Sequence, residues 1–352
     1  MLHILIFGGT AAVFFAMTLS TLFHLRWARR LPSLPELLGG NESLPMNRPT
    51  PDPSQEGSKR SSASSQFPSW EGLGVGSWSQ ITASKSLRLS KNRNTGPRHG
   101  MFSASLLHRA VPAACPPVRR VSVVLAARDE EARIETTIRH LLAQQFVPVD
   151  VTVVDDRSKD RTSEILQRLA NEDARLRVIR VDLLPEGWLG KCHACHLGAA
   201  AATGDWILFT DADCWLKPDV IARALLMAEL DGVDHITLTP GVAPHTPAAR
   251  AWHLAFLITL TDWISGVNRD KPGKYLGLGA FNLARTTAYR QCGGYEALRL
   301  TVLDDVKLGL LLRRAGKRTR AFIGGDDTEC HWGATAGSMV QVMEKNYFAA
   351  LE

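Results

Sequence analysis

Cysteine is scarce in this sequence, and its spacing supplies neither of the usual cysteine frameworks. The chain of 352 residues contains six cysteines. So few predict a protein of a reducing compartment without a disulfide framework. A zinc site needs four ligands, or three and a water molecule, and these usually come from separated pairs. Cys192 and Cys195 form the chain's single C-x-x-C pair, which argues against zinc.

The same pair belongs to the string "CHACH", Cys192 to His196, which matches the C-x-x-C-H pattern of covalent haem attachment. Helical spacing would place Cys192, Cys195 and His196 on one face. Haem attachment normally takes place outside the cytoplasm, whereas the topology inferred below puts this segment inside. We therefore interpret the cysteines as small buried apolar side chains. A redox protein built on these three residues is the alternative.

Charge is missing from the start of the chain, since the first 23 residues hold no Lys, Arg, Asp or Glu. An apolar run of this length can cross a bilayer as a helix. Arg26, Arg29 and Arg30 follow it, and the positive-inside rule then places everything downstream in the cytoplasm. A cleaved signal peptide would carry its positive charge before the apolar run. We expect residues 1–25 to be an uncleaved, single-pass anchor in the cell (inner) membrane.

The next stretch shows neither the helical nor the strand spacing of apolar residues. From about residue 39 to residue 118 the chain is rich in Ser, Pro and Gly. Such a segment buries too little apolar surface to offset its ordering entropy, so we expect residues 26–118 to be a disordered basic linker. The first 118 residues hold 12 basic and 5 acidic residues, whereas the rest hold 29 and 30. The folded part shows no clustered basic footprint, so no nucleic-acid partner is expected.

Residues 119–352 have the pattern of a folded domain in which strands and helices alternate. β-branched apolar runs predict strands over residues 121–127, 149–156, 176–181 and 205–213. Apolar residues at helical spacing predict helices over residues 130–145, 159–173 and 191–202 and from near Pro218. Asp129 stands where the N-cap of the first helix belongs. The alternation predicts an α/β fold with a mainly parallel central sheet.

Carboxylates follow two of these strands. Ligands of such sheets bind beyond the carboxyl ends of the strands. Asp155 and Asp156 end the second strand, where Asp156 can accept a hydrogen bond from a nucleobase or ribose; an Asp-rich turn that caps the next helix is the alternative. Asp211 and Asp213 end the fourth strand. Two carboxylates at this spacing can share Mg²⁺ or Mn²⁺, although surface pairs of this kind are common.

A second acidic pair, Asp304 and Asp305, begins a later amphipathic helix. A carboxylate at such a position can act as a general base towards a hydroxyl group. The alternative is an acid of the first helical turn that the helix dipole favours.

Taken in order, five segments resemble the inverting GT-A glycosyltransferases of family two. They are "VSVVLAARDEE", "VTVVDDRSKDRT", "GWLGK", "ILFTDADC" and "LDDVKLGLLLRRAGKR". The likeness covers about residues 120–330, and "GWLGK" before the D-x-D is similar to the membrane-anchored, hopene-associated branch. The resemblance implies the GT-A (nucleotide-diphospho-sugar transferase) fold for residues 119–352, with the catalytic domain in the cytoplasm.

The resemblance also implies a site for a nucleotide-sugar donor. Its donor-binding residues would be Ala126, Arg128, Asp155, Asp156, Lys191 and Asp211. Asp211 and Asp213 would hold Mg²⁺ or Mn²⁺ on the diphosphate, where the metal stabilises charge on the leaving nucleotide. Lys191 would add positive charge there; a solvated lysine at a helix start is its alternative role.

Asp305 matches the family's catalytic base, which deprotonates the acceptor hydroxyl for in-line attack and inverts the anomeric carbon. Asp304 takes a position that Glu often fills and is the second catalytic candidate. Three features depart from the family pattern. Asp129 replaces the Asn of the first motif, and no Q-x-x-R-W motif follows the base, which favours transfer of a single sugar. The chain also stops at Glu352 without the further membrane helices common among relatives, so we expect a truncated or divergent form.

The acceptor side carries two informative segments. Residues 248–267 are apolar but broken by Asp262, which predicts a helix in the membrane interface or, equally, a buried helix. Glycines within 275–289 would let the backbone approach a ligand closely, and His331 is a candidate for closing over the donor. With the anchor, these features predict a lipid or other apolar hydroxyl acceptor. We expect a metal-dependent, hexosyltransferase-like membrane enzyme; the alternative is an inactive GT-A scaffold that binds nucleotide or lipid.

Overall fold

The computed structural model describes residues 30–33, 119–242 and 247–331. These residues belong to one compact unit. The predicted anchor of residues 1–25 and nearly all of the predicted linker lie outside the described residues. Within them, the model contains no helix that is both long and apolar enough to cross a bilayer.

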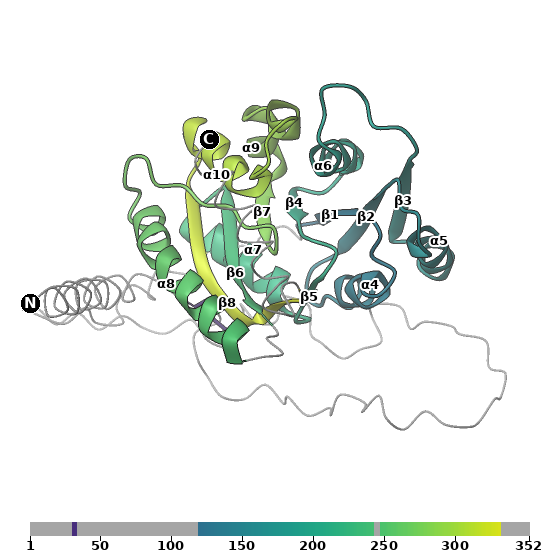
Figure 1. Ribbon diagram of the computed structural model, residues 1–352. Helices are drawn as coiled ribbons and strands as arrows, with labels where there is room; N and C mark the ends of the chain where they lie inside the picture. The colour runs from purple at the N-terminus through teal and green to yellow at the C-terminus, as the bar shows by residue number, and fades with distance from the viewer. Residues whose placement is uncertain (1–29, 34–118, 243–246, 332–352) are drawn as a thin grey trace, which may run out of the picture. The chain divides into compact units, whose positions relative to one another are not determined.

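Among the described residues, eight strands form one sheet in the order β3-β2-β1-β4-β7-β6-β8-β5 (Figure 1). The strands are β1 Val121–Ala127, β2 Val149–Asp156, β3 Leu176–Val181, β4 Trp206–Phe209, β5 Cys214–Leu216, β6 His235–Val242, β7 Asn282–Arg285 and β8 Thr319–Cys330. The helices are α4 Ile134–Leu142, α5 Thr162–Glu172, α6 Gly190–Ala201, α7 Val220–Asp231, α8 Pro247–Asn268, α9 Thr286–Gln291 and α10 Asp304–Arg314, with a 3-10 turn at Gly294–Leu298.

The prediction of a mainly parallel sheet is correct for the first half of the fold and wrong for the second. β1 pairs in parallel with β2 and with β4, and β2 pairs in parallel with β3. β7 is antiparallel to both of its neighbours, β4 and β6, and β5 is antiparallel to β8. β8 runs parallel to β6, and its last residues also pair with the short strand β5, so the mixed sheet curls at this end (Figure 1). The helix α8 lies between β6 and β7 in the chain, yet β7 returns antiparallel to β6, because a helix between two strands permits a parallel crossover but does not enforce one.

Helices cover both faces of the sheet, which explains why its central strands β1 and β4 are almost continuously apolar. Alternate residues of β1 point to opposite faces. Val123 and Leu125 pack in the core beneath α4, α5 and α7. Val124 packs in the other core, which α6, α9 and α10 cover. Figure 1 shows α6 on one side of the strands and α4 and α5 on the other.

Residues 30–33 fall within the range predicted as linker, yet they pack on the folded unit. Leu31 is fully buried in the core beneath α7. Arg223 of α7 donates to the carbonyl oxygens of Leu31 and Pro32 at 3.4 and 3.3 Å. The core therefore includes a short segment that is distant in sequence from the rest of the domain.

Two boundaries differ from the sequence prediction. The first helix begins at Ile134, not near residue 130, and Asp129 is not its N-cap. Asp129 instead has a left-handed backbone with φ of 56°, and its carboxylate accepts from the backbone N–H of Lys159 at 2.7 Å. The fourth strand ends at Phe209, so Asp211 and Asp213 lie in the turn that leads to β5.

The cysteines behave in two ways. Cys214 and Cys330 form a disulfide between β5 and β8, which corrects the expectation that the chain has none. Cys192 and Cys195 are free and buried, as interpreted from the sequence. Burial raises the pKa of Cys192 to about 12. No potential metal cluster of three or more ligands within the described part of the chain includes either of them.

Gly204, just before β4, packs closely against the backbone at the start of β1. A Cβ atom at this position would lie 2.7 Å from the backbone nitrogen of Ser122 and 2.8 Å from the carbonyl oxygen of Arg120. Because backbone atoms cannot rotate away, Gly204→Ala is expected to lower the free energy of unfolding by about 2 kcal/mol. Urea unfolding measures the change. Thr203→Ala, at an exposed neighbour, is the control and should change it little; equal midpoints for all three proteins would contradict the prediction.

Candidate active site

The candidate site lies where the parallel strands β1, β2 and β4 reach one edge of the sheet. Because these strands share a direction, the turns that follow them are neighbours in space. Each turn carries an acid, and the sequence alone had already suggested the turns after β2 and β4. The turn after β1 adds Glu130.

Asp155, at the end of β2, holds the β2–α5 turn together. It is 1% exposed, and its carboxylate accepts from the backbone N–H of Ser158, the hydroxyl of Ser163 and the guanidinium of Arg180. Burial raises its pKa, but these hydrogen bonds outweigh burial and the net pKa is lowered. Asp155 therefore stabilises the turn that presents its neighbour Asp156.

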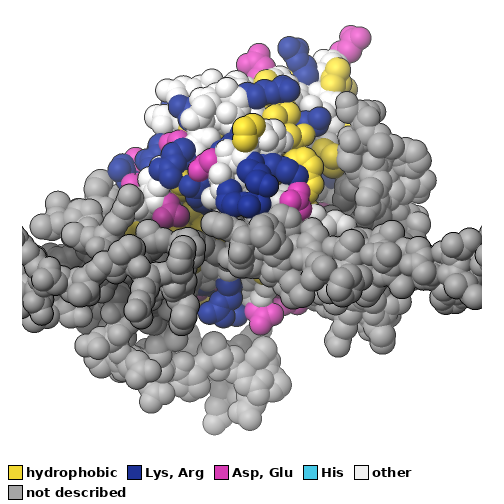
Figure 2. All heavy atoms as spheres, turned by 90° about the vertical axis from the view of Figure 1, so that its left-hand side faces the viewer, with side chains coloured by type: hydrophobic (Ala, Val, Ile, Leu, Met, Phe, Trp, Pro, Cys, Tyr) yellow, Lys and Arg dark blue, Asp and Glu magenta, His cyan; other side chains and the backbone are white. Residues whose placement is uncertain are grey.

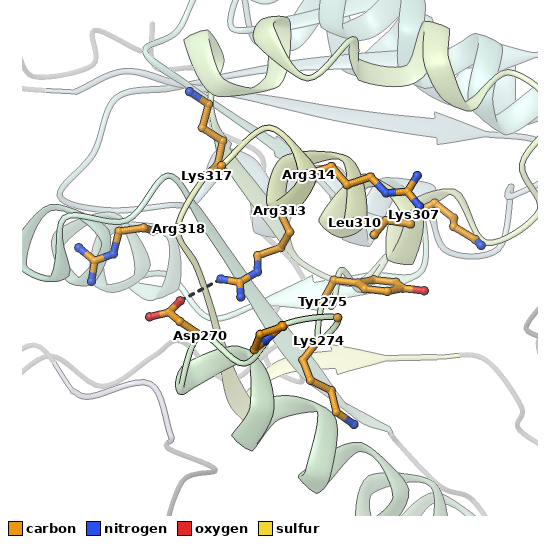
Figure 3. A pocket seen from close by; sticks show the side chains of 12 residues that line it. Asp270, Lys274, Tyr275, Lys307, Leu310, Arg313, Arg314, Lys317 and Arg318 are labelled. Atoms are coloured by element: carbon orange, nitrogen blue, oxygen red, sulfur yellow. Dashed lines mark hydrogen bonds and ion pairs between the residues drawn. The ribbon is translucent and has the colours of Figure 1, made fainter.

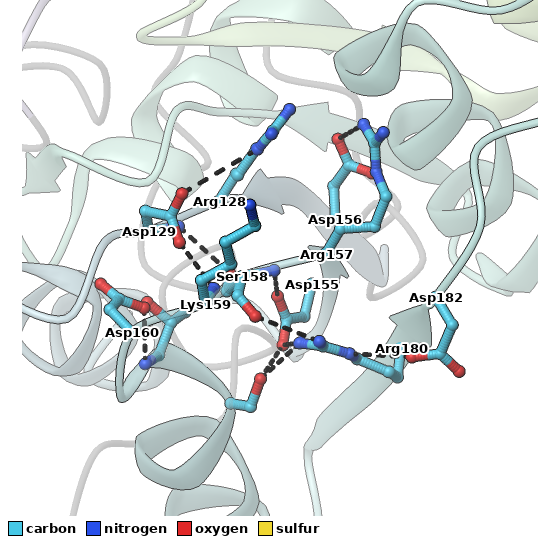
Figure 4. Close-up of polar contacts among 12 residues, drawn as sticks. Arg128, Asp129, Asp155, Asp156, Arg157, Ser158, Lys159, Asp160, Arg180 and Asp182 are labelled. Atoms are coloured by element: carbon cyan, nitrogen blue, oxygen red, sulfur yellow. Dashed lines mark hydrogen bonds and ion pairs between the residues drawn. The ribbon is translucent and has the colours of Figure 1, made fainter.

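Asp156 faces the other way. Figure 4 shows Arg128, Asp156 and Arg157 extending to one side of the strand ends, opposite Asp155 and Arg180. Arg157 makes two hydrogen bonds to the Asp156 carboxylate, at 2.8 and 2.9 Å. A side chain at Gly190, the first residue of α6, would overlap the Asp156 carboxylate. Asp156 thus lies between the strand ends and the N-terminus of α6.

The two other residues predicted in this pocket come from the end of β1. Ala126 is partly buried against two clusters of apolar side chains, both of which include residues of α6. The Arg128 side chain is 53% exposed and lies 4.0 Å from Asp129. Asp129 links the turns after β1 and β2, since its carboxylate accepts from Lys159 and its N–H donates to Ser158. Asn could accept the same hydrogen bond, so the departure from the family pattern preserves this contact.

Asp211 and Asp213 occupy the turn between β4 and β5. One carboxylate oxygen of each and Cys214 Sγ lie within 4.8 Å of one another. Burial and the nearby Asp211 carboxylate raise the pKa of Asp213 to about 6. The backbone of the turn is held from outside: the Asp213 carbonyl accepts from His331 N–H at 3.1 Å. The predicted pair therefore converges, and like-charge repulsion within it favours a bound cation.

Lys191, predicted either as a donor-site residue or as a solvated lysine, is paired with acids although its side chain is 40% exposed. It lies at the N-terminus of α6, and its ammonium donates to Asp211 at 2.7 Å and lies 3.9 Å from Asp304. Burial lowers its pKa, but Asp211, Asp304 and Asp305 more than offset this and hold the pKa well above its ordinary value. Lys191 therefore stays charged and joins the two acidic pairs.

Asp305 is held by backbone donors at the start of α10. Its carboxylate accepts from Gly279 N–H at 2.6 Å and from Val306 N–H at 2.8 Å. Burial and the adjacent Asp304 raise its pKa to about 6. Asp304 is buried, and it accepts from the hydroxyl of Tyr295 at 3.0 Å. The two residues of the pair thus have different surroundings: Asp304 is fixed in the interior by Tyr295, and Asp305 is held by backbone N–H groups.

The glycines between α8 and β7 allow the two acidic pairs to approach each other. A Cβ at Gly277 would overlap the carbonyl oxygen of Asp305, and one at Gly279 would overlap the Asp211 carboxylate. The sequence predicted that this segment lets backbone approach a ligand. In the structure, it is the acidic groups that the segment approaches.

Sequence reasoning missed three residues of the site. Glu130 lies near both D-x-D carboxylates; burial and Asp213 raise its pKa to about 7. Asn282 of β7 donates to the Asp305 carbonyl at 3.2 Å, and its side-chain oxygen is bonded to the buried ring of His235. The strand-end rule would have found Glu130, because it follows β1. Asn282 and His235 carry no such signal, since antiparallel pairing of β6 and β7 brings them to the site.

The residues present fit a hard divalent cation. Asp211 and Asp213 offer carboxylate oxygens, the ligands that Mg²⁺ and Mn²⁺ prefer. Cys214 belongs to the disulfide and offers no thiolate, so a soft-metal site is not indicated. The raised pKa of Asp213 has the origin that a bound cation would relieve.

Comparison with known proteins gives one family. The family model described as glycosyl transferase family 2 matches residues 122–298, about half of the chain. A "4,4'-diaponeurosporenoate glycosyltransferase" of Staphylococcus haemolyticus (strain JCSC1435) is 26% identical over 210 residues, covering 58% of this chain and 54% of the relative. The protein of that name from Staphylococcus aureus (strain USA300) is 28% identical over 197 residues, covering 54% and 50%. The chain thus spans about half the length of these relatives.

Two solved structures are also similar. One is the mannosyltransferase PcManGT from Pyrobaculum calidifontis in complex with GDP-Man and Mn2+, with a TM-score of 0.47, 20% identity and coverage of 65% of this chain and 64% of that one. The other is S. aureus TarS 1-349 in complex with UDP-GlcNAc, with a TM-score of 0.44, 16% identity and coverage of 60% and 58%.

The raised pKa of Glu130 predicts a pH-dependent cost. Its folded-state pKa of about 7 exceeds the ordinary 4.5, so the folded state binds more protons between these values and stability is lost as pH rises through them. In the absence of divalent cations, Glu130→Gln should stabilise the protein by on the order of 1–2 kcal/mol more at pH 8 than at pH 5.

Urea unfolding at both pH values, with a chelator present, measures this difference. Glu164→Gln, which removes an exposed carboxylate on α5, is the matched control and should show no such pH dependence. An equal effect of Glu130→Gln at the two pH values would contradict the assignment.

Proposed function

The chain belongs to glycosyl transferase family 2, and from this premise we propose that it is a membrane-anchored, inverting glycosyltransferase. It moves one sugar from a nucleotide-sugar donor to a hydroxyl group of an apolar acceptor, with a divalent metal. The observation that carries the proposal is the bridge formed by Lys191 between Asp211 and the pair Asp304 and Asp305. A donor site and a base for the acceptor then lie side by side. Both Staphylococcus relatives are named for 4,4'-diaponeurosporenoate and not for a polysaccharide, which supports transfer to a single small acceptor.

The donor lies over the ends of β1, β2 and β4. Asp156 accepts from the nucleoside, and Arg128, exposed on the same side of the strand ends, approaches it from the turn after β1. Ala126 forms the apolar floor of this pocket. Asp155 acts indirectly, by holding the β2–α5 turn that presents Asp156.

The diphosphate lies beside the D-x-D turn. Asp211 and Asp213 would hold Mg²⁺ or Mn²⁺, which when bound supplies Lewis-acid stabilisation of the charge on the departing diphosphate. Lys191 donates to Asp211 in the free protein. With a donor present, the same ammonium is placed to donate to a phosphate oxygen, so positive charge is already in position when negative charge develops.

Asp305 acts on the acceptor. With a pKa of about 6, the Asp305 carboxylate is mostly ionised at neutral pH. Its pKa also lies close to that pH, as an effective general base requires. Gly279 N–H holds one of its oxygens. The hydroxyl proton passes to the carboxylate as the hydroxyl oxygen attacks the anomeric carbon, and the nucleotide leaves from the opposite face. Asp304 positions the helix start through Tyr295.

The membrane assignment rests on the sequence. Residues 1–25 form the single-pass anchor in the inner membrane, and the catalytic domain is cytoplasmic. The hopene-associated branch and a polyprenyl or triterpenoid alcohol acceptor are part of this proposal. On α8, Ile264 and Val267 are buried, whereas Trp263 is 37% exposed. The end of this helix is thus partly buried and partly available to a membrane interface.

Donor binding tests the first half of the proposal. Calorimetric titration of the full chain with UDP- and GDP-sugars should give Mn²⁺-dependent binding of one donor. Asp213→Asn should weaken that binding at least about tenfold, because it removes a charged ligand of the metal. Asp326→Asn, at an exposed position on β8, is the matched control and should bind like the wild type. Binding that is indifferent to Mn²⁺ in both proteins would contradict the metal site.

Turnover tests the second half. With the donor identified above and lipid extract as acceptor, Asp305→Asn should lower kcat by about 10²–10⁴ because it removes the base, while donor affinity stays within a few-fold. In the wild type, kcat should rise with pH through about 6, as the carboxylate ionises. Radiolabelled sugar incorporation measures both. A variant with wild-type kcat would exclude Asp305 as the base, and donor binding without turnover on any acceptor would favour the scaffold.

A further inference from the structure

A hollow of about 820 Å³ lies outside the candidate active site. It is bounded by α10 on one side and by the segment joining α8 to β7 on the other (Figure 3). The turn between α10 and β8 completes it. None of the donor or base residues discussed above lines it, so the proposed reaction leaves it without a role.

The hollow is strongly basic. Its charged lining is Lys274, Lys307, Arg313, Arg314, Lys317 and Arg318, with Asp270 as the one acid among the described lining residues. Asp270 is already matched, since it accepts from Arg313 at 2.9 Å and from Arg320 at 3.0 Å. Figure 2 shows Lys and Arg side chains gathered on the face that carries α8, with hydrophobic side chains between them. The face therefore has a net positive charge that the described acids do not neutralise.

Lys307, which is partly exposed, and Arg314, which is exposed, are two cations of this surface. No hydrogen bond or ion pair joins either side chain to another residue in the described part of the chain. They are seven residues apart on α10, so they share a face and stand about 10 Å apart along the helix. In Figure 3 both extend in the same direction, with Leu310 between them and the ring of Tyr275 on the same side. Cations so spaced do not converge on one phosphate; they fit separate anionic groups in an array.

Aromatic side chains flank these cations. The ring of Trp263 lies 5.5 Å from that of Tyr275 in an edge-on contact. The ammonium of Lys274 lies 4.3 Å from the centroid of the Trp263 ring. Lys274 also pairs with Asp262. Tryptophan and tyrosine beside lysine are typical of the level of lipid head groups, where an apolar ring and a charged tip are both accommodated.

The hollow is connected to the catalytic base by one continuous contact. Beyond Tyr275 the chain packs along α10: a Cβ at Gly309 would overlap the Leu276 carbonyl oxygen, and one at Gly277 would overlap that of Asp305. The basic hollow and Asp305 thus lie at two ends of the same seam between α10 and the α8–β7 segment. A surface that binds at the hollow fixes the orientation of the base relative to it.

We propose that this basic face, made of Trp263, Lys274, Tyr275, Lys307 and Arg314, docks on an anionic phospholipid surface and orients the acceptor side towards the bilayer. The proposal rests on the proposed function in placing the chain at a membrane, but it needs neither donor nor turnover. Each basic residue near such a surface contributes about a fivefold gain in affinity, and the attraction decays within a Debye length. Docking is therefore sensitive to salt.

The test is lysine acylation of the full chain reconstituted into vesicles, quantified by peptide mass spectrometry. Labelling of Lys307 is compared between phosphatidylcholine vesicles and vesicles with 30% phosphatidylglycerol, with Lys217 as the internal reference because its side chain is 53% exposed and away from the hollow. We expect phosphatidylglycerol to lower Lys307 labelling at least threefold in low salt and to have little effect in 0.5 M NaCl.

Two variants and one soluble probe sharpen the result. Arg314→Glu should abolish the protection of Lys307. Arg177→Glu, the same charge change on β3 at the opposite edge of the sheet, should leave it intact. Equal labelling of Lys307 in both kinds of vesicle would overturn the proposal. So would equal protection by glycerol phosphate in phosphatidylcholine vesicles, which would make the hollow a site for a free phosphate. Because no sugar or acceptor is present, failure here is distinct from failure of the transferase assignment.

Discussion

The site is organised by a charge imbalance that the fold must accommodate. Parallel strands bring Asp156 and the D-x-D turn to one edge, and α10 adds Asp304 and Asp305 nearby. Burial, and after it the neighbouring carboxylates, raise the pKa of Asp213 and of Asp305 to about 6. Lys191 is the positive charge at their centre, and it bonds directly to Asp211. That ammonium opposes the rise in the pKa of Asp213 and of Asp305, and so favours their charged forms.

Holding such a cluster requires rigid supports, and the structure provides them in backbone contacts. Gly277 and Gly279 have no side chains, which lets the α8–β7 segment fit between the acidic pairs. The buried ring of His235 is bonded to the Asn282 oxygen, so the Asn282 amide group is turned to donate to the Asp305 carbonyl. Burial lowers the pKa of His235 to about 4, so the ring is neutral at physiological pH. The cluster is thus fixed by neutral groups behind it.

The features that depend on neighbouring residues in the sequence were predictable, whereas those that depend on contacts between distant segments were not. The first three strands, and helix α6, match the runs of apolar residues that predict them, because β-branched runs and helical spacing are local properties. The D-x-D pair converges as predicted. The boundary at Ile134 was missed because Asp129 bonds to a distant loop instead of capping a helix. Glu130 was missed because the predicted first helix, residues 130–145, included it, although it follows β1. The antiparallel insertion of β7, the disulfide between Cys214 and Cys330, and the contact of Leu31 with the core all join segments whose sequence carries no record of the partner.

The same distinction explains why the basic face could not be recognised from composition. Residues 119–352 hold nearly equal numbers of acidic and basic residues, so the domain appears neutral when counted along the chain. Folding separates the signs. Carboxylates concentrate at the carboxyl ends of the strands, where a cation and a diphosphate would be bound, and guanidinium and ammonium groups concentrate around the far end of α10. One helix therefore carries residues of both proposed surfaces, with Asp305 in its first turn and Arg314 in its last. Each sign also suits the helix dipole at its own end. A dipolar helix of this kind links the two surfaces mechanically, because whatever fixes the basic end of α10 also fixes the direction in which Asp305 faces.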